Sequence, residues 1–287
     1  MSVVVTGATG HLGRLVVEDL LSHGVPPEQV VAGGRRLERI ADLADRGVRT
    51  ARIDYADPTT VAEAVAGAET LLLVSGSELG QRIDQHRTVI GAARSAGVRR
   101  IVYTSAPKAD TSTLIVAPEH KATEELIRAS GLDFTLLRNN WYTENYLANV
   151  EQARGTGQLL SSTGAGRVAS ATRADFAAAA SAVLRTEGHD GAVYELGGDQ
   201  PWDYDELAAA IGRVIGRPVV HNDVSPEEHL AILTGAGLDE QTAGFVVAMD
   251  ANIRDGLLAG GPTDLSRLIG RPTTPLVDGL RSAVGRD

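Results

Sequence analysis

The fold is indicated by the first thirteen residues, Met1-Ser-Val-Val-Val-Thr-Gly-Ala-Thr-Gly-His-Leu-Gly13. A short apolar run ends at a glycine-rich turn, and an amphipathic stretch over residues 12–21 follows it, which predicts a strand, a phosphate-binding turn and a helix. In such a turn Gly7 permits the tight bend, Gly10 lets the backbone approach a pyrophosphate, and Gly13 lets helix and strand pack closely. The amides at the helix N-terminus also favour a phosphate. The turn therefore predicts a dinucleotide site.

The first half of the chain alternates between strand and helix patterns. The pattern predicts strands at residues 3–5, 30–32, 48–53, 70–74, 101–104 and 134–137, with one more at 193–196. It predicts helices at residues 12–21, 37–46, 60–65, 81–96, 119–130 and 173–184. Alternation of this kind predicts an α/β protein with a Rossmann-type doubly wound parallel sheet.

The rhythm changes after Arg138. Residues 155–166 are rich in glycine and serine, and beyond residue 197 the pattern alternates helices with glycine-bearing loops. We therefore expect residues 1–138 to form a dinucleotide-binding Rossmann domain. Residues 139–287 are expected to form mainly a smaller C-terminal α/β substrate lobe, with residues 170–197 returning to the sheet.

The composition excludes several classes of function. The formal net charge of −10 and the lack of a basic run argue against a nucleic-acid-binding surface. There is no cysteine, and the seven histidines are scattered without ligand spacing, so we expect no metal site. No apolar stretch approaches the roughly 20 residues of a spanning helix, so we expect a cytoplasmic protein that is not bound to a membrane. The sequence leaves open whether it is a monomer or a homodimer.

The residues after the second and third strands bear on the choice of dinucleotide. Proteins that prefer NAD place a carboxylate after the second strand, whereas those that prefer NADP place an arginine nearby. Here Arg35 and Arg36 follow that strand, and a guanidinium can bind a 2′-phosphate. We predict NADPH, with the start of a surface helix as the alternative interpretation of this pair. Asp54 and the pair Ser75-Gly76 are expected at the same crevice.

A resemblance to a known family is carried by three stretches of the chain. These are Gly97-Val-Arg-Arg-Ile-Val-Tyr-Thr-Ser105, then Glu119-His120, then Gly131-Leu-Asp-Phe-Thr-Leu-Leu-Arg-Asn-Asn-Trp-Tyr-Thr-Glu-Asn-Tyr146. The sequence resembles the NmrA-like branch of the atypical short-chain dehydrogenases, and within it the NAD(P)H:quinone oxidoreductase type 2 proteins. The resemblance implies a flavin-free, NADPH-dependent two-electron reduction of quinones.

The family resemblance also shows what is missing. Short-chain dehydrogenases carry a serine and a Tyr-x-x-x-Lys motif, in which the tyrosine donates a proton to the substrate carbonyl. Ser105 and Lys121 stand at the places of the serine and the lysine, but the tyrosine position holds Ala117. Hydride addition to a quinone gives a delocalised anion, so a quinone needs less proton donation than a ketone, for which a general acid contributes ~10²–10⁴-fold. The missing tyrosine therefore favours quinones as acceptors.

The remaining candidates lie on two helices and after the sixth strand. Arg82 and His86 are one helical turn apart, and they either reach the cofactor side or form a solvated face. For catalysis the candidates are Lys121, His120, Asn140 and Tyr142, with an exposed helix surface as the alternative for Lys121 and His120. For the acceptor they are Trp141, Tyr142, Asn145 and Tyr146, with lobe core as the alternative for Trp141 and Tyr146. For the cofactor they are Thr6, Gly7, Thr9, Gly10, His11, Leu12, Gly13, Arg35, Arg36, Asp54, Ser75, Gly76, Ser105, Lys121 and Asn139.

Two other functions stay open at this point. One is a non-catalytic NADP(H)-sensing regulator that binds a protein partner, which the incomplete catalytic set favours. The other is a biosynthetic NADPH-dependent reductase of an aromatic ketone, enone or imine. The aromatic residues after the sixth strand favour an enzyme, because they suit a flat small-molecule acceptor.

Overall fold

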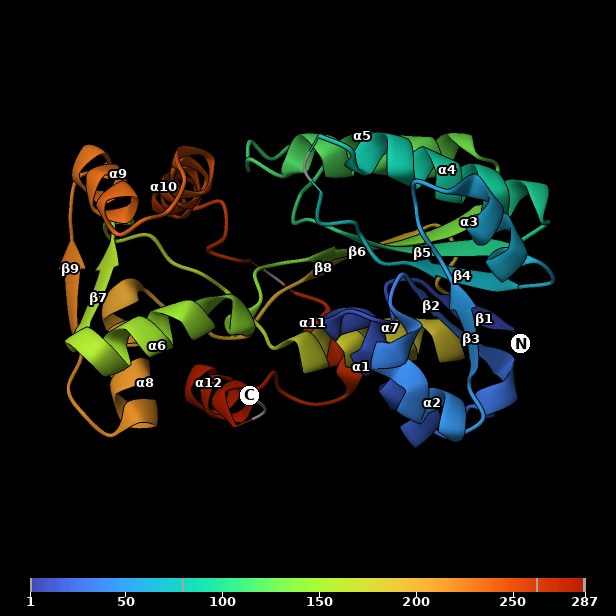
Figure 1. Ribbon diagram of the computed structural model, residues 1–287, viewed down its shortest axis with the longest axis horizontal. Coiled ribbons are helices and arrows are strands. Elements are labelled where there is room, and N and C mark those ends of the chain that lie inside the picture. The colour runs from blue at the N-terminus through green and yellow to red at the C-terminus, as the bar shows by residue number, and fades with distance from the viewer. Residues whose placement is uncertain (1, 79, 262, 286–287) are drawn as a thin grey trace.

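A seven-stranded parallel sheet runs through one side of the molecule (Figure 1). The computed structural model describes residues 2–78, 80–261 and 263–285. The sheet has the order β3-β2-β1-β4-β5-β6-β8. Its strands are β1 (Val3–Val5), β2 (Val30–Gly34), β3 (Arg49–Arg52), β4 (Thr70–Leu73), β5 (Arg100–Ser105), β6 (Asp133–Asn139) and β8 (Ala192–Leu196). This is a doubly wound, Rossmann-type arrangement, as the alternating pattern predicts.

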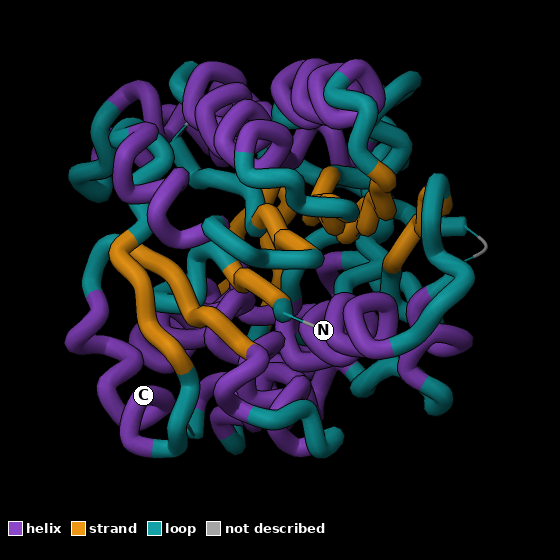
Figure 2. The backbone as a smooth tube through the Cα atoms, turned by 90° about the vertical axis from the view of Figure 1, so that its right-hand side faces the viewer, coloured by secondary structure: helices purple, strands orange, loops and turns teal. Residues whose placement is uncertain are grey.

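Helices cover both faces of this sheet. Figure 2 shows the strands between two helical layers. One layer holds α3 (Pro58–Val65), α4 (Arg82–Ser95) and α5 (Ala117–Ala129), and the other holds α1 (His11–Ser22), α2 (Ala41–Asp45), α7 (Arg173–Arg185) and α11 (Leu265–Ile269). The three valines of β1 are completely buried because apolar clusters pack on both sides of the strand.

The second half of the chain adds a smaller lobe beside the carboxyl ends of the strands (Figure 1). A parallel pair of short strands, β7 (Gln158–Ser161) and β9 (Val220–Asp223), forms its sheet. Around it lie α6 (Leu147–Thr156), α8 (Tyr204–Ile215), α9 (Pro226–Gly235), α10 (Glu240–Arg254) and α12 (Leu276–Val284). Its core packs Trp202, Tyr204 and Leu207 against residues of α6, α10 and α12. α7 and β8 come from this half of the chain but belong to the large sheet.

The structure differs from the sequence pattern in three places. Residues 37–46 form a 3₁₀ turn at Leu37–Ile40 followed by the short α2, rather than one helix. The pattern predicts no strand at β7 or β9, because β7 lies in the glycine- and serine-rich segment and β9 has a single apolar residue, Val220. The two strands are defined by pairing with each other, and they lie about sixty residues apart in the sequence.

The strand order places an opening at the carboxyl ends of β1 and β4. β1 pairs with β2 on one side and with β4 on the other, so the chain runs outward in both directions from this strand. Crossover connections then leave in opposite directions, and a crevice forms between them. None of the helices in the described ranges is long and apolar enough to cross a membrane.

Candidate functional site

A cleft of about 370 Å³ opens where the carboxyl ends of β1, β2 and β4 meet. Many of the residues predicted to hold a dinucleotide line it, namely Gly7, Thr9, Gly10, His11, Leu12, Gly13, Arg35, Arg36, Asp54, Ser75 and Gly76. The sequence pattern does not single out the other lining residues, which are Gly34, Arg39, Ile53, Tyr55, Val74, Ser77, Glu78 and Gln85. The cleft therefore joins the glycine turn to the segments that follow β2, β3 and β4.

The glycine turn after β1 is packed too closely for side chains. Gly7 has φ of +62°, a left-handed conformation that favours glycine. A Cβ atom on Gly13 would lie 2.5 Å from the carbonyl oxygen of Gly7, and one on Gly34 would lie 2.4 Å from Oγ1 of Thr9. The N-cap of α1 is Gly10, with no side chain bonded to the first-turn amides. These amides remain available to an anion in the cleft.

Three arginines stand along the cleft after β2. Arg35 and Arg36 are exposed, and Arg39, one turn further on, also lines the opening. Arg35 forms an ion pair with Glu78, with 2.8 Å between Nη1 and Oε1. The sequence offers one sign that Arg39 belongs to the cleft, because it lies four residues after Arg35. Arg39 lies in the 3₁₀ turn over Leu37–Ile40, where the sequence pattern predicts the start of a regular helix.

Thr6 lies beneath the cleft rather than in its lining. The residue is fully buried, and its Oγ1 accepts a hydrogen bond from the backbone N–H of Val74 at 3.0 Å. The Tyr55 hydroxyl contacts the same oxygen and donates to the carbonyl of Val74 at 2.7 Å. Burial raises the pKa of Tyr55 above its usual range. Thr6 and Tyr55 thus join the ends of β1 and β4 through polar groups.

Buried side chains of α4 hold the segment that follows β4. The backbone N–H of Gly76 donates to Nε2 of His86 at 3.0 Å, and Nε of Arg82 donates to the Gly76 carbonyl at 2.8 Å. Arg82 also forms an ion pair with Glu119 at 2.7 Å. Burial, together with the nearby Arg82 charge, lowers the pKa of His86 to about 3. Arg82 and His86 are therefore buried braces of this cleft wall, and they do not form a solvated face.

His120 and Lys121 are neighbours on α5 but lie in different environments. His120 is buried, and its Nδ1 is 2.8 Å from the Tyr103 hydroxyl. Burial is the main cause that lowers the pKa of His120 to about 3, with Arg82 adding to it. Lys121 is exposed, and its amine has no hydrogen-bond or ion-pair partner among the described residues. The structure therefore brings His120, and not Lys121, next to the end of β5.

Ser105 and Ala117 both take part in buried packing. The Ser105 hydroxyl donates to Oε1 of Glu124 at 2.7 Å, and Arg138 makes a two-pronged contact with the same carboxylate at 2.9 and 2.7 Å. Ala117, at the place of the family's tyrosine, is fully buried and packs in the core of the smaller lobe. The Ser105 hydroxyl is thus committed to a buried ion pair.

Asn139 carries a buried acceptor that has no partner in the described part of the chain. It is the last residue of β6 and is 7% exposed. Its Nδ2 donates to the Tyr142 hydroxyl at 3.4 Å, while its Oδ1 is buried without a hydrogen bond. A buried polar atom normally has a partner. Asn139 therefore has an open acceptor at the carboxyl edge of the sheet.

The other residues after β6 point in different directions. Nδ2 of Asn140 donates to the Leu258 carbonyl at 3.3 Å, so this residue ties the segment to the smaller lobe. Tyr142 packs edge-on against Phe176 of α7, with a ring-centroid distance of 5.3 Å. Oδ1 of Asn145 accepts a hydrogen bond from Arg173 of α7.

The two remaining aromatic candidates belong to the core of the smaller lobe. Tyr146 is 4% exposed and packs edge-on against Trp202, with 5.0 Å between the ring centroids. Trp141 is half-buried and packs against the same apolar cluster. Of the substrate candidates, Tyr142 is therefore the one that contacts Asn139, and the structure does not gather all four around one cavity.

Two further cavities lie at the junction of the lobes. A small pocket of about 100 Å³ sits at the ends of β6 and β8, and Asn140, Leu196, Leu257 and Lys108 are among its lining residues. Lys108 has φ of +47° and is the single non-glycine residue with positive φ in the described ranges. Its backbone N–H donates to both carboxylate oxygens of Glu195.

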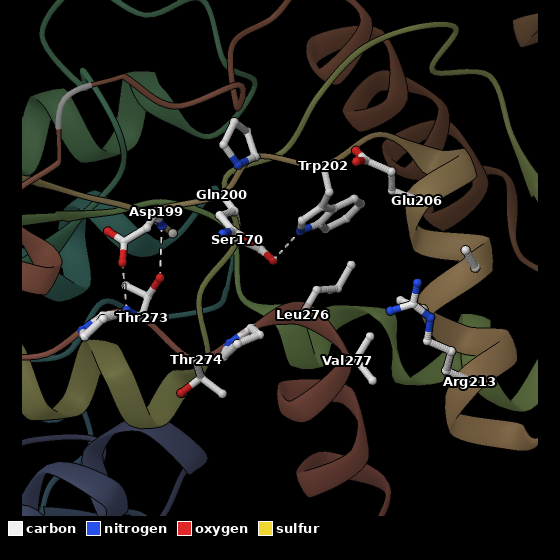
Figure 3. Close-up of a pocket in the computed structure, with 16 residues that line it drawn as sticks. Ser170, Asp199, Gln200, Trp202, Glu206, Arg213, Thr273, Thr274, Leu276 and Val277 are labelled. Carbon is white, nitrogen blue, oxygen red and sulfur yellow. Dashed lines mark hydrogen bonds between the residues drawn. The ribbon is translucent and has the colours of Figure 1, made fainter.

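The other cavity, of about 420 Å³, lies between the segment after β8, α8 and the start of α12 (Figure 3). Figure 3 shows Asp199 hydrogen-bonded to Thr273 on one side of the cavity, and Trp202 hydrogen-bonded to Ser170. The backbone N–H of Asp199 donates to the Thr273 hydroxyl at 2.9 Å, and Nε1 of Trp202 donates to the Ser170 hydroxyl at 3.0 Å. Asp199 and Thr273, and Trp202 and Ser170, are thus hydrogen-bonded to each other in pairs on the cavity wall.

The described residues contain no group of three or more histidine or acidic side chains that could hold a metal ion. The polar groups that line the cleft are backbone amides, guanidinium groups, neutral polar side chains and the carboxylates of Asp54 and Glu78.

Comparison with known proteins points to one family. The family described as NAD(P)H-binding matches residues 7–187. Quinone oxidoreductase 2 of Escherichia coli (strain K12) is 44% identical over 97% of this chain and 97% of its own length. NAD(P)H azoreductase of Xenophilus azovorans is 27% identical over 94% of this chain and 93% of its own length.

Solved structures agree with these relatives. The crystal structure of the NADPH-dependent quinone oxidoreductase of Escherichia coli in complex with NADPH has a TM-score of 0.92 and 43% identity, and it covers 99% of each chain. The triphenylmethane reductase of Citrobacter sp. complexed with NADP(H) has a TM-score of 0.92 and 39% identity, covering 98% of this chain and 100% of the other.

Proposed function

The chain belongs to the NAD(P)H-binding family, and from that premise we propose that it reduces quinones with NADPH without a flavin. The observation that carries the proposal is the cleft at the strand ends, in a chain 44% identical over nearly its whole length to a quinone oxidoreductase. When bound there, NADPH supplies a hydride. The chain's own residues hold the cofactor, orient the acceptor and stabilise the charge that develops on it.

The residues of the cleft fit a dinucleotide at both ends. A Cβ atom at Gly13 or Gly34 would clash with Gly7 or Thr9, so the glycines let the turn pack closely and keep the first turn of α1 at the cleft. The uncapped first-turn amides of α1 suit the phosphates. Outside the cleft lining, at the carboxyl end of β6, the unpartnered Oδ1 of Asn139 can accept a hydrogen bond from an amide or hydroxyl group of the nicotinamide half. Arg35, with Arg36 and Arg39, suits a 2′-phosphate, which supports NADPH over NADH.

Quinones suit the polar groups that remain near the end of β5. Ser105 donates to Glu124, and Ala117 has no proton to give, so the group that would protonate a localised alkoxide is absent from these two positions. His120 is neutral at physiological pH because its pKa is lowered to about 3. The Tyr103 hydroxyl lies 2.8 Å from Nδ1 of His120, and in the tautomer in which this hydroxyl donates to Nδ1, Nε2 carries the proton and can donate a neutral hydrogen bond. Such a donor suits the delocalised anion of a reduced quinone.

The test is NADPH oxidation by the purified, flavin-free protein with 1,4-benzoquinone and 1,4-naphthoquinone, corrected for the uncatalysed reaction. We expect saturable turnover that is at least about tenfold less efficient with NADH, because a charge-assisted 2′-phosphate contact is worth about 1.5–3 kcal/mol. Cyclohexanone is the control acceptor and should not be reduced. Binding of NADPH without turnover on any quinone would contradict the proposal and favour a sensor of NADP(H).

A further inference from the structure

An ion pair joins the two walls of the cleft at its mouth. Arg35 follows β2 and Glu78 lies between β4 and α4, and these strands flank β1 on opposite sides. The 2.8 Å contact between Nη1 of Arg35 and Oε1 of Glu78 therefore bridges the opening above the glycine turn. Both residues line the cleft. Arg35, the guanidinium that the sequence predicts as the main 2′-phosphate contact, thus already has an anionic partner within the protein.

Glu78 has a second hydrogen-bond partner within the protein, on α4. Nε2 of Gln85, a largely buried residue of α4, donates to the other carboxylate oxygen of Glu78 at 2.9 Å. Just before Glu78, the backbone of Gly76 is fixed by His86 and Arg82 through both its N–H and its carbonyl. Both carboxylate oxygens of Glu78 are therefore engaged, one by Arg35 and the other by Gln85.

The other cleft arginines differ from Arg35 in this respect. The guanidinium groups of Arg36 and Arg39 are exposed, and neither has an ion-pair partner in the described ranges. The Asp54 carboxylate accepts a hydrogen bond from the backbone N–H of Ala56. Glu78 is therefore the acidic side chain of the cleft that is directly bonded to a phosphate-binding candidate.

We propose that Glu78 is a specificity-determining residue that competes with the cofactor's 2′-phosphate for Arg35 and so limits the preference for NADPH over NADH. A 2′-phosphate that reaches Arg35 must displace the Glu78 carboxylate or lie beside it, and two anions repel each other. A 2′-hydroxyl can instead donate a hydrogen bond to the carboxylate. This inference rests on the proposed function, which places NADPH in this cleft.

The exposure of the pair sets the size of the effect. The side chain of Arg35 is 63% exposed and that of Glu78 is 38% exposed. Ion pairs in such surroundings contribute up to about 1 kcal/mol, which corresponds to about fivefold in a dissociation constant. Glu78 should therefore tune the preference for the phosphorylated cofactor without reversing it.

The experiment measures nucleotide binding by titration calorimetry, with no acceptor present. The probes are 2′,5′-ADP and 5′-AMP, which differ only in the 2′-phosphate. Glu78→Gln keeps the shape of the side chain and removes its charge, and Glu125→Gln on the outer face of α5 is the control for the change in net charge. We expect Glu78→Gln to tighten 2′,5′-ADP about fivefold, to leave 5′-AMP within about twofold, and Glu125→Gln to change neither.

A double variant separates the ion pair from long-range charge. In the Arg35→Ala background, Glu78→Gln should tighten 2′,5′-ADP by less than about twofold, because the competed group is gone. Unchanged or weaker 2′,5′-ADP binding in the Glu78→Gln single variant overturns the inference while leaving the proposed function standing. If the unmodified protein binds neither probe, both the cofactor assignment and the inference are wrong. Absence of quinone turnover alone counts against the proposed function and does not affect this test.

Discussion

The turn after β1 and the segment after β6 lie at the same edge of the sheet but are built differently. In the turn, close backbone packing defines the site, since a Cβ atom on Gly13 would lie 2.5 Å from the Gly7 carbonyl oxygen. After β6, neighbouring side chains diverge: Asn140 bonds to Leu258 and Tyr146 enters the lobe core. A site made of backbone is visible in the sequence as glycines. A site made of side chains depends on where each one points.

The largest effect on NADPH binding should come from adding a side chain to the glycine turn. Gly13→Ala places a methyl group against the Gly7 carbonyl, so we expect the dissociation constant for NADPH to rise more than about hundredfold as the turn opens. Gly91→Ala is the matched control, since that exposed position on α4 has no atom within 4 Å of the added carbon. Fluorescence titration with NADPH checks both variants. Normal binding by Gly13→Ala would show that the turn does not set the site.

A second prediction concerns acid stability of the wall behind the cleft. The folded pKa values of His86 and His120 are about 3, below the ~6.5 of an unfolded chain. The unfolded state therefore binds more protons between about pH 6.5 and 3, and stability falls as pH falls through this window, by about 1.4 kcal/mol per pH unit for each histidine. Urea unfolding at pH 7, 6 and 5 measures the slope.

The variant His120→Gln tests the assignment of that slope. Removing one of the two histidines should reduce the pH dependence by about 1.4 kcal/mol per pH unit between pH 6 and 5. An unchanged slope would mean that His120 is accessible to protons in the folded state, and its role as a neutral donor would be lost with it.

The third prediction addresses the side chains that supplement the backbone site. Arg35→Ala should weaken NADPH about tenfold and leave NADH within about twofold, because only the 2′-phosphate contact is removed. The ratio of kcat/KM for the two cofactors with one quinone measures this directly. If the ratio does not change, Arg36 or Arg39 makes the contact, and the Arg35 assignment is wrong.

The smallest effect is expected at Ser105. Its hydroxyl donates to the buried Glu124, which keeps two hydrogen bonds from Arg138 when Ser105 is replaced by alanine. Ser105→Ala should therefore lower the free energy of unfolding by about 1 kcal/mol and change the KM for NADPH by less than about twofold. Thermal unfolding and steady-state kinetics check the two parts. A hundredfold rise in KM would instead place this hydroxyl on the cofactor.

The sequence predicts the large sheet well because its elements are local and strongly patterned. β1 and α1 agree with the expected apolar run and amphipathic stretch within a residue, and the glycines mark the turn between them. The short strands β7 and β9 have no such pattern. Each acquires its identity by pairing with the other across the smaller lobe.

The cleft could be predicted only in part, for a related reason. Tyr55, Glu78 and Gln85 line it because three separate segments converge there, and no spacing in the sequence records that convergence. The neighbouring candidates Lys121 and His120 on α5 also could not be told apart from the sequence. Adjacent helix positions point in different directions, so His120 is buried beside Tyr103 while Lys121 faces solvent.

Hydride transfer from NADPH to a quinone is tested directly by a single-turnover reaction with NADPH that carries deuterium at the transferred position of C4. The flavin-free protein, in excess over NADPH, is mixed with 1,4-naphthoquinone, and the loss of nicotinamide absorbance is followed. We expect rapid loss that slows at least about twofold with deuterium, together with hydroquinone formed in equal amount to the NADPH consumed. No acceleration over the reaction without protein would contradict it.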